Sequence, residues 1–180
     1  MHDRVSPPYR GPALARYNLA IRYQRRMTMI RSVTAADIQE WLRMRHALWP
    51  DGSPTQHRQD IDRYFAGDRR EPAEVLLALT ANSAPVGFAE LSIRNIVDGC
   101  STDRVAYLEG WYVDPESRRH GIGRALIHAA EQWAMRQGCT EFGSDSELDN
   151  DVSCAAHLHS GFQETGRVRT FRKKLDENSP

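Results

Sequence analysis

The stretch "VAYLEGWYVDPESRRHGIGRALI", residues 105–127, contains the change of periodicity that decides the fold. Residues 105–113 are rich in β-branched and aromatic side chains, which is typical of a strand. After Gly121 the apolar side chains recur at helical spacing, at Leu126, Ala130 and Trp133. We therefore expect a strand over 105–113, a loop with glycines, and a helix that runs to Gly138.

The loop between this strand and helix has the features of an anion site. The first N–H groups of a helix lack intrahelical partners, and glycines let a ligand approach them closely. Arg118, Arg119 and Arg124 add positive charge there. A Walker loop is excluded because no Gly-Lys-Ser/Thr follows, and "GIGRAL" lacks the third small residue of a Rossmann turn. The alternative is a flexible turn with a solvated basic rim.

Further strands and helices are expected before and after this strand–loop–helix unit. Thr34 with Asp37 three residues later resembles a capping box at the start of a helix. We expect further strands over 30–33, in "VLLALTA", "VGFAELSI" and "TEFGSD", and in the closing "GFQETGRVRTFRKKL", with helices over 38–48, 55–65 and 151–160. The order β-α-α-β-β-β-α-β-α-β predicts a single α/β domain around one mixed sheet.

Charge and composition limit the partners. Residues 1–27 contain six arginines and one aspartate, whereas the remaining residues contain 18 basic and 23 acidic side chains. An acidic body favours a cationic ligand over nucleic acid. Three cysteines without CxxC spacing favour a reducing cytoplasm, and "HLH" at 157–159 lacks the spacing of a helical metal pair. We expect no metal, and no membrane span because no run approaches about 20 apolar residues.

The two ends are expected to lie outside the domain. Residues 1–27 have prolines at 7, 8 and 12 and no sustained apolar repeat. They are predicted to be a disordered extension, or to result from a start placed upstream of Met27 or Met29. A basic arm for nucleic acid or membrane is the alternative. The domain is expected over 28–175, with a tail over 176–180.

Two acidic residues are candidate functional groups. Alternation along the strand predicts that Val105, Tyr107, Glu109, Trp111 and Val113 share one face. A lone carboxylate among aromatic side chains is costly to bury unless it is paired or hydrated, which marks Glu109 as functional. The alternative is that Gly110 marks a bulge that leaves Glu109 exposed. Asp145 ends a strand, where aspartate often caps turns, and the acidic run that follows could attract a polycation without contact.

Several segments together resemble a known family. "VDPESRRHGIGRAL" resembles the acetyl-coenzyme A motif of the Gcn5-related N-acetyltransferases, here Arg118-x-x-Gly121-x-Gly123, and "DNDVSCAAHLHSGF" resembles their later motif. "RHALWP", "GFAELSIR", "NIVDGC", "YLEGWYVDP", "SDSELDN" and "GFQETGRV" resemble the aminoglycoside 6′-N-acetyltransferases. The similarity covers about residues 30–175. It implies a GNAT-like α/β (α+β) domain, in which a mixed, mostly antiparallel sheet is flanked by helices and splays to form an acetyl-CoA cleft.

The resemblance also implies roles for individual residues. Glu109 and Asp145 match the acidic residues beside the acceptor amine, as catalytic and substrate-binding groups, and Trp49 matches an aromatic residue of the aminoglycoside site. The residues that would bind acetyl-CoA are Trp111, Tyr112, Val113, Arg118, Arg119, His120, Gly121, Ile122, Gly123, Arg124, Asn150 and Ser153.

The activity implied is acetyl transfer from acetyl-CoA to the 6′-amine of an aminoglycoside, by direct attack in a ternary complex of a cytoplasmic homodimer. One departure is that "RVRTFRKKL" has Phe171 and no tyrosine, where many members carry a tyrosine that protonates CoA thiolate. Two alternatives stay open: transfer to a polyamine or another small amine, and an acetyl-CoA-binding regulatory module with little catalysis.

Overall fold

The computed structural model describes residues 28–174, and a five-stranded sheet forms its centre. The strands lie side by side in the order of the sequence: β1 (Met29–Ser32), β2 (Glu74–Leu79), β3 (Pro85–Arg94), β4 (Val105–Val113) and β5 (Phe142–Ser144). The first four strands pair antiparallel, and β5 pairs parallel with β4. The predicted mixed, mostly antiparallel sheet is confirmed.

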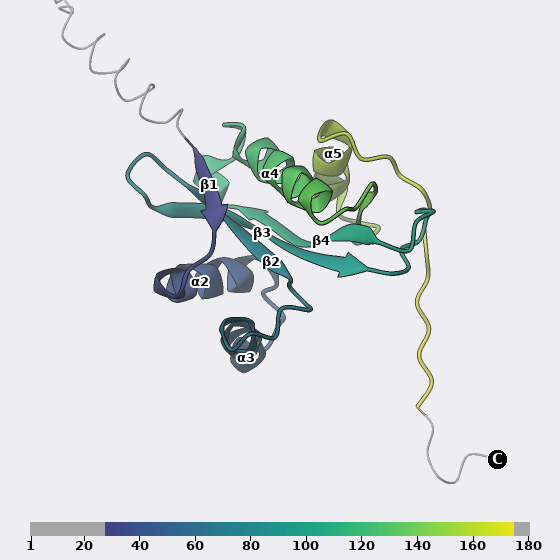
Figure 1. Cartoon of the computed structure of the whole chain (residues 1–180), viewed down its shortest axis with the longest axis horizontal. Helices are drawn as coiled ribbons and strands as arrows, with labels where there is room; N and C mark the ends of the chain where they lie inside the picture. Colours follow the sequence, from purple (N-terminus) through teal and green to yellow (C-terminus); the bar gives the residue numbers. More distant parts are fainter. Residues whose placement is uncertain (1–27, 175–180) are drawn as a thin grey trace, which may run out of the picture.

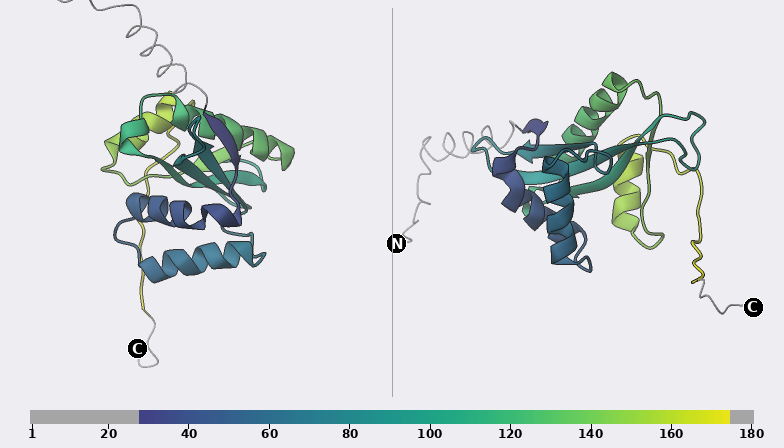
Figure 2. Two further views of the ribbon diagram at one scale, coloured as in Figure 1. Left: turned by 90° about the vertical axis from the view of Figure 1, so that its left-hand side faces the viewer. Right: turned by 60° about the horizontal axis from the view of Figure 1, so that its bottom comes forward.

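Helices cover both faces of this sheet. α2 (Ile38–Leu48) and α3 (Pro54–Phe65) stack against one face, and α4 (Ile122–Arg136) crosses the other, with α5 (Asp151–His159) beside it at the β5 edge (Figures 1 and 2). Two apolar cores result. One lies between α4 and the sheet around Leu91 and Leu126, and the other lies between α2, α3 and the sheet around Trp41 and Phe88. Strand β2 is apolar and buried from Val75 to Leu79 because both its faces are covered.

The first helical turn is fixed by the predicted capping residues. Asp37, in the 3₁₀ turn Ala35–Asp37, accepts hydrogen bonds from the Thr34 N–H at 2.8 Å and from the Thr34 hydroxyl at 2.7 Å. Arg31 also donates to both carboxylate oxygens, a contact that the sequence pattern did not indicate. The Arg31 guanidinium and the Thr34 donors hold the pKa of Asp37 far below its usual range.

A β-bulge in β4 overturns the predicted alternation. Glu90 pairs with Gly110 and Leu91 pairs with Leu108, so Glu109 is the extra residue of the bulge. The expectation that Val105, Tyr107, Glu109, Trp111 and Val113 share one face is therefore wrong. Ala106 and Leu108 face α4 before the bulge, and Trp111 and Val113 face it afterwards. The inserted residue shifts the period of two by one position.

The predicted C-terminal strand is also wrong for the residues described. From Gln163 to Lys174 the chain has no strand, and it leaves the body as an extended, exposed segment (Figure 1). Phe171, where a tyrosine would be expected, is 91% exposed. The β-type pattern has no partner here: β5, at the adjacent edge, is only three residues long, and unpaired backbone groups turn to water.

The extension predicted over residues 1–27 and the tail predicted over 176–180 lie outside the described part of the chain, as does residue 175, the predicted end of the domain. None of the helices described is both long and apolar enough to cross a membrane.

Candidate active site

Glu109 lies in the bulge and is held by three donors. The Arg94 guanidinium contacts both of its oxygens, with Nη2 at 2.6 Å from Oε2 and Nε at 3.0 Å from Oε1. The buried Ser92 hydroxyl also donates to Oε1. The bulge considered as an alternative is present, but it does not leave Glu109 free: the side chain is 20% exposed and ion-paired.

Asp145 joins the same group through Tyr107. The Tyr107 hydroxyl donates to Asp145 Oδ1 at 2.6 Å, and burial together with this hydrogen bond raises the pKa of Tyr107. The Arg94 guanidinium carbon lies 3.6 Å from the centre of the Tyr107 ring. The structure thus brings the two predicted carboxylates together through Arg94 and Tyr107, which sequence reasoning missed. The available signal was the alternation Glu90-x-Ser92-x-Arg94, which puts polar side chains on one face of β3.

Trp49 follows the last residue of α2 and lies against Gly110, the residue after Glu109 in β4. Its indole packs so closely on Gly110 that a Cβ there would stand 2.5 Å from Cη2. His57 stacks on Trp49 with ring centres 6.1 Å apart, and the Arg45 guanidinium lies 5.2 Å from the indole centre. Trp49 is therefore positioned from several sides and forms an aromatic wall next to the carboxylate.

A buried cluster of charged side chains contacts Trp49 through the Arg45 guanidinium. Trp41 Nε1 donates to Glu90 Oε1 at 2.7 Å, and Arg45 Nε lies 3.5 Å from the same oxygen. Arg45 also donates to Asp60 at 3.2 Å. Burial raises the pKa of Glu90 to about 7, against the opposing effect of Arg45. Neither Glu90 nor Arg45 was among the predicted site residues.

Beyond the bulge, β4 runs free of β5. Their pairing covers Ala106–Leu108, so the edge of Trp111–Val113 that faces away from β3 has no strand partner among the residues described. The Trp111 indole N–H is buried and has no hydrogen-bond partner among the residues described. Tyr112 turns its ring into the core beside Phe88, and its backbone pairs with Phe88 of β3. This arrangement fits a ligand that pairs with the edge of β4.

The loop that follows leads directly to the start of α4. Gly121 has a positive φ of 82° and precedes the helix, and a Cβ on Gly123 would come within 2.9 Å of Trp111 Cζ2. Arg118 Nε donates to the Val113 carbonyl at 2.9 Å, which ties the loop to the end of β4. Arg119, His120 and Arg124 are exposed, whereas Ile122 is buried in the α4 core, so its side chain packs and its backbone alone faces the loop.

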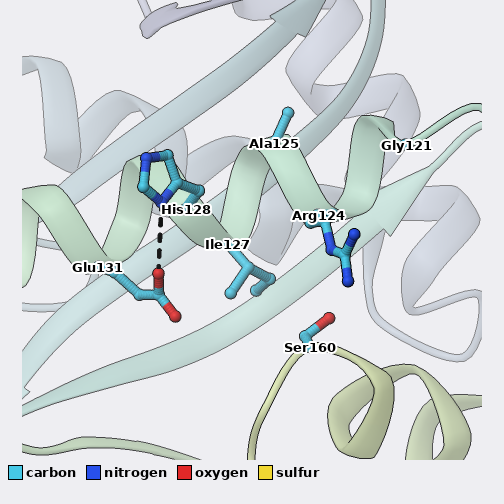
Figure 3. A pocket seen from close by; sticks show the side chains of 7 residues that line it. All are labelled: Gly121, Arg124, Ala125, Ile127, His128, Glu131 and Ser160. Atoms are coloured by element: carbon cyan, nitrogen blue, oxygen red, sulfur yellow. Dashed lines mark ion pairs between the residues drawn. The ribbon is translucent and has the colours of Figure 1, made fainter.

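A pocket of about 470 Å³ continues from this loop along α4 (Figure 3). Its lining comprises Gly121, Arg124, Ala125, Ile127, His128, Glu131 and, across from the helix, Ser160. The guanidinium of Arg124 and the exposed helix start give this end of the pocket the character of an anion site.

Asn150 and Ser153 lie at the start of α5. Asn150 Oδ1 accepts from the Ser153 N–H at 3.0 Å and so caps the helix. His157 bridges α5 to β5: its Nδ1 lies 2.8 Å from the Ser153 carbonyl and its Nε2 lies 2.9 Å from the Ser144 hydroxyl. Within residues 28–174, no group of three or more His, Cys, Asp or Glu side chains is placed to hold a metal ion.

Residues 38–162 match the model of the acetyltransferase (GNAT) family. Among curated proteins, an aminoglycoside N(6′)-acetyltransferase type 1 from Klebsiella aerogenes is 48% identical over 147 residues, which cover 82% of this chain and 97% of that protein. A protein of the same name from Acinetobacter haemolyticus is 42% identical over 148 residues, 82% of this chain and 99% of that one.

Solved structures agree with these matches. AAC(6′)-Iy in complex with the bisubstrate analogue CoA-S-monomethyl-acetylneamine superposes with a TM-score of 0.76 at 32% identity, covering 83% of this chain and 99% of that one. The apo enzyme AAC(6′)-IG from Acinetobacter haemolyticus has a TM-score of 0.76 at 40% identity, over 82% and 99% of the two chains.

Proposed function

The chain belongs to the GNAT family of acetyltransferases and, within it, to the aminoglycoside N(6′)-acetyltransferases, and we propose that Glu109, Asp145 and Trp49 receive the acceptor amine. The enzyme transfers the acetyl group of acetyl-CoA to the 6′-amino group of an aminoglycoside. The observation that carries the assignment of residues is the convergence of Glu109, Asp145 and Trp49 where β4 separates from β5.

Two carboxylates suit an amine acceptor. An alkylamine arrives at neutral pH as an ammonium and must lose a proton before it can attack a thioester. Glu109 attracts the cation and accepts this proton, directly or through water. Asp145, held by Tyr107 and largely exposed, attracts a second ammonium group, and Trp49 provides an apolar wall for a sugar ring.

Acetyl-CoA would bind along the edge of β4 beyond its pairing with β5 and at the start of α4. Along Trp111, Tyr112 and Val113, the backbone groups that face away from β3 and are not held by Arg118 would pair with the amides of the pantetheine arm as an added strand does. The N–H groups of the loop 119–124 at the start of α4 would hold the pyrophosphate. Arg118 positions that loop, and Asn150 with Ser153 would contact the arm from α5.

We also propose that the protein acts as a cytoplasmic homodimer. Support comes from the short edge strand β5 and from the extended segment after it, in which Val168 and Phe171 are exposed. Both features are suited to association with a second copy, because an open sheet edge can accept a strand and the exposed Val168 and Phe171 side chains can be covered. Sedimentation of the wild type and of Phe171→Glu tests this: the variant is expected to dissociate.

The test of function is steady-state acetylation of kanamycin and of spermidine, followed by release of the CoA thiol. We expect turnover with kanamycin, with kcat/KM reduced at least about tenfold in Glu109→Gln and in Asp145→Asn. Glu40→Gln and Asp62→Asn, at exposed ion pairs on α2 and α3, are the matched controls. Turnover with spermidine alone would favour a polyamine enzyme, and no CoA release with either amine would favour a binding module.

A further inference from the structure

We propose that Arg94 occupies, in the free enzyme, the place that the acceptor ammonium takes on Glu109, and that this internal cation restricts the enzyme to acceptors with several positive charges. The inference rests on the proposed role of Glu109 and adds a residue that sets acceptor specificity.

The geometry is that of a cation already bound at the acceptor carboxylate. Arg94 contacts both Glu109 oxygens from two nitrogens, which is the strongest way for a guanidinium to engage a carboxylate. Ser92 donates to Oε1 as well, so Glu109 has three donors before any substrate arrives. An acceptor ammonium can contact Glu109 closely only if it takes over contacts that Arg94 makes.

This exchange gives little net gain to an acceptor with one charge. One cation replaces another at Glu109, and the bidentate pair that is lost is geometrically better than the pair that is formed. A polycation can form further ion pairs near Glu109. Asp145 lies at the hydroxyl end of Tyr107, whose ring packs against the Arg94 guanidinium. Exposed Glu147, Asp149 and Asp151 follow. Additional ammonium groups bind these carboxylates and offset the cost of moving Arg94.

The structure also provides a place for the displaced guanidinium. Its carbon already lies 3.6 Å from the centre of the Tyr107 ring, within the range of a cation–π contact. Partial burial lowers the pKa of Arg94, but its hydrogen bond to Glu109 and the charge of that carboxylate outweigh it, so the pKa lies above its ordinary value and the guanidinium stays charged. The side chain is 35% exposed, so it can move without opening the core.

The experiment compares two acceptors that present the same type of primary amine: kanamycin, a polycation, and 6-amino-6-deoxyglucose, which has one amine. In Arg94→Gln we expect the KM of both acceptors to fall about fivefold, because neither then has to displace a cation from Glu109, and the amino sugar, which has no other carboxylate contacts to offset that cost, becomes a measurable substrate. Arg94→Lys keeps a cation at the site and is expected to retain the KM values of the wild type. Arg58→Gln, which breaks an exposed Arg–Asp pair on α3, is the matched control.

The proposal is overturned if Arg94→Gln raises KM for either acceptor, leaves both KM values unchanged, or alters kcat alone, because Arg94 would then only hold Glu109 in place. Dissociation constants of both acceptors, measured by calorimetry with CoA present, give the same ratio without turnover. A wild type that acetylates neither amine would contradict the proposed function, and the binding ratio would still decide the role of Arg94. Melting temperatures identify a variant that has lost its fold.

Discussion

The indole of Trp49 lies against the backbone of Gly110, where a Cβ would stand 2.5 Å from Cη2 and 2.8 Å from Cζ2. Only a residue without a side chain allows this approach. Because Gly110 follows Glu109 directly in β4, the contact places an aromatic side chain from α2 beside the carboxylate of the bulge. Glycine at this position therefore serves packing between two elements rather than turn formation.

Gly110→Ala is expected to push the indole out of this place. The added methyl group should cost about 1–3 kcal/mol of unfolding free energy, as overpacking does, and should raise KM for the acceptor more than KM for acetyl-CoA. Urea denaturation and steady-state kinetics measure the two effects. Gly166→Ala is the control for stability, since a Cβ there meets nothing within 4 Å. Equal stability of the two variants would contradict the contact.

Tyr107→Phe removes the hydrogen bond to Asp145 and keeps the ring beneath Arg94. Asp145 then loses the donor that orients it, and kcat/KM for kanamycin should fall about threefold to tenfold, as for loss of a hydrogen bond to a partly exposed charged group. The effect should appear mainly in acceptor KM. Unchanged kinetics would show that Asp145 is positioned without Tyr107.

Gly123→Ala should weaken acetyl-CoA binding selectively. Its methyl group would come within 2.9 Å of Trp111 Cζ2 and would separate α4 from the free edge of β4. We expect KM for acetyl-CoA to rise at least about threefold, with KM for kanamycin nearly unchanged, because the two sites lie on different sides of the bulge. A rise confined to kanamycin would be evidence against this arrangement.

Glu90→Gln should change how stability depends on pH. Burial raises the pKa of Glu90 from an ordinary 4.5 to about 7 in the folded protein, so between these values the folded state holds a proton that the unfolded state has released. The wild type should therefore lose stability as pH rises through this interval, by an amount of order 1–3 kcal/mol.

Glutamine keeps an acceptor for the Trp41 indole but does not titrate, so the difference in unfolding free energy between variant and wild type should shift in favour of the variant from pH 4.5 to 7. Urea denaturation at closely spaced pH values measures this difference. A difference that stays constant over the interval would show that Glu90 does not titrate there.

Much of the framework could be predicted from local patterns. The strand 105–113 has the predicted bounds, the helices over 38–48 and 151–160 agree within a residue, and Thr34 with Asp37 marks the start of α2 as expected. These features depend on neighbours within about one turn or two strand positions, for which periodicity and capping are sufficient.

The site itself required the tertiary structure. Glu109 and Asp145 could be named as acidic residues at strand positions, and Gly121 with Gly123 as a loop before a helix. The pairing of Arg94 with Glu109 depends on the register of β3 against β4. The bulge shifts this register by one residue, and a periodic sequence pattern does not specify such a shift. The burial of Glu90 depends on helices from another part of the chain.

Periodicity thus determined which segments of residues 29–159 form strands and helices, because each residue's preference is set by its near neighbours, whereas the C-terminal β-type pattern lacked a strand to pair with. The tertiary structure decided which charges meet, because ion pairs form between side chains that strand register and helix packing bring within a few ångströms. In this protein the position of the candidate catalytic carboxylate depends on one inserted residue, Glu109, at the bulge of β4.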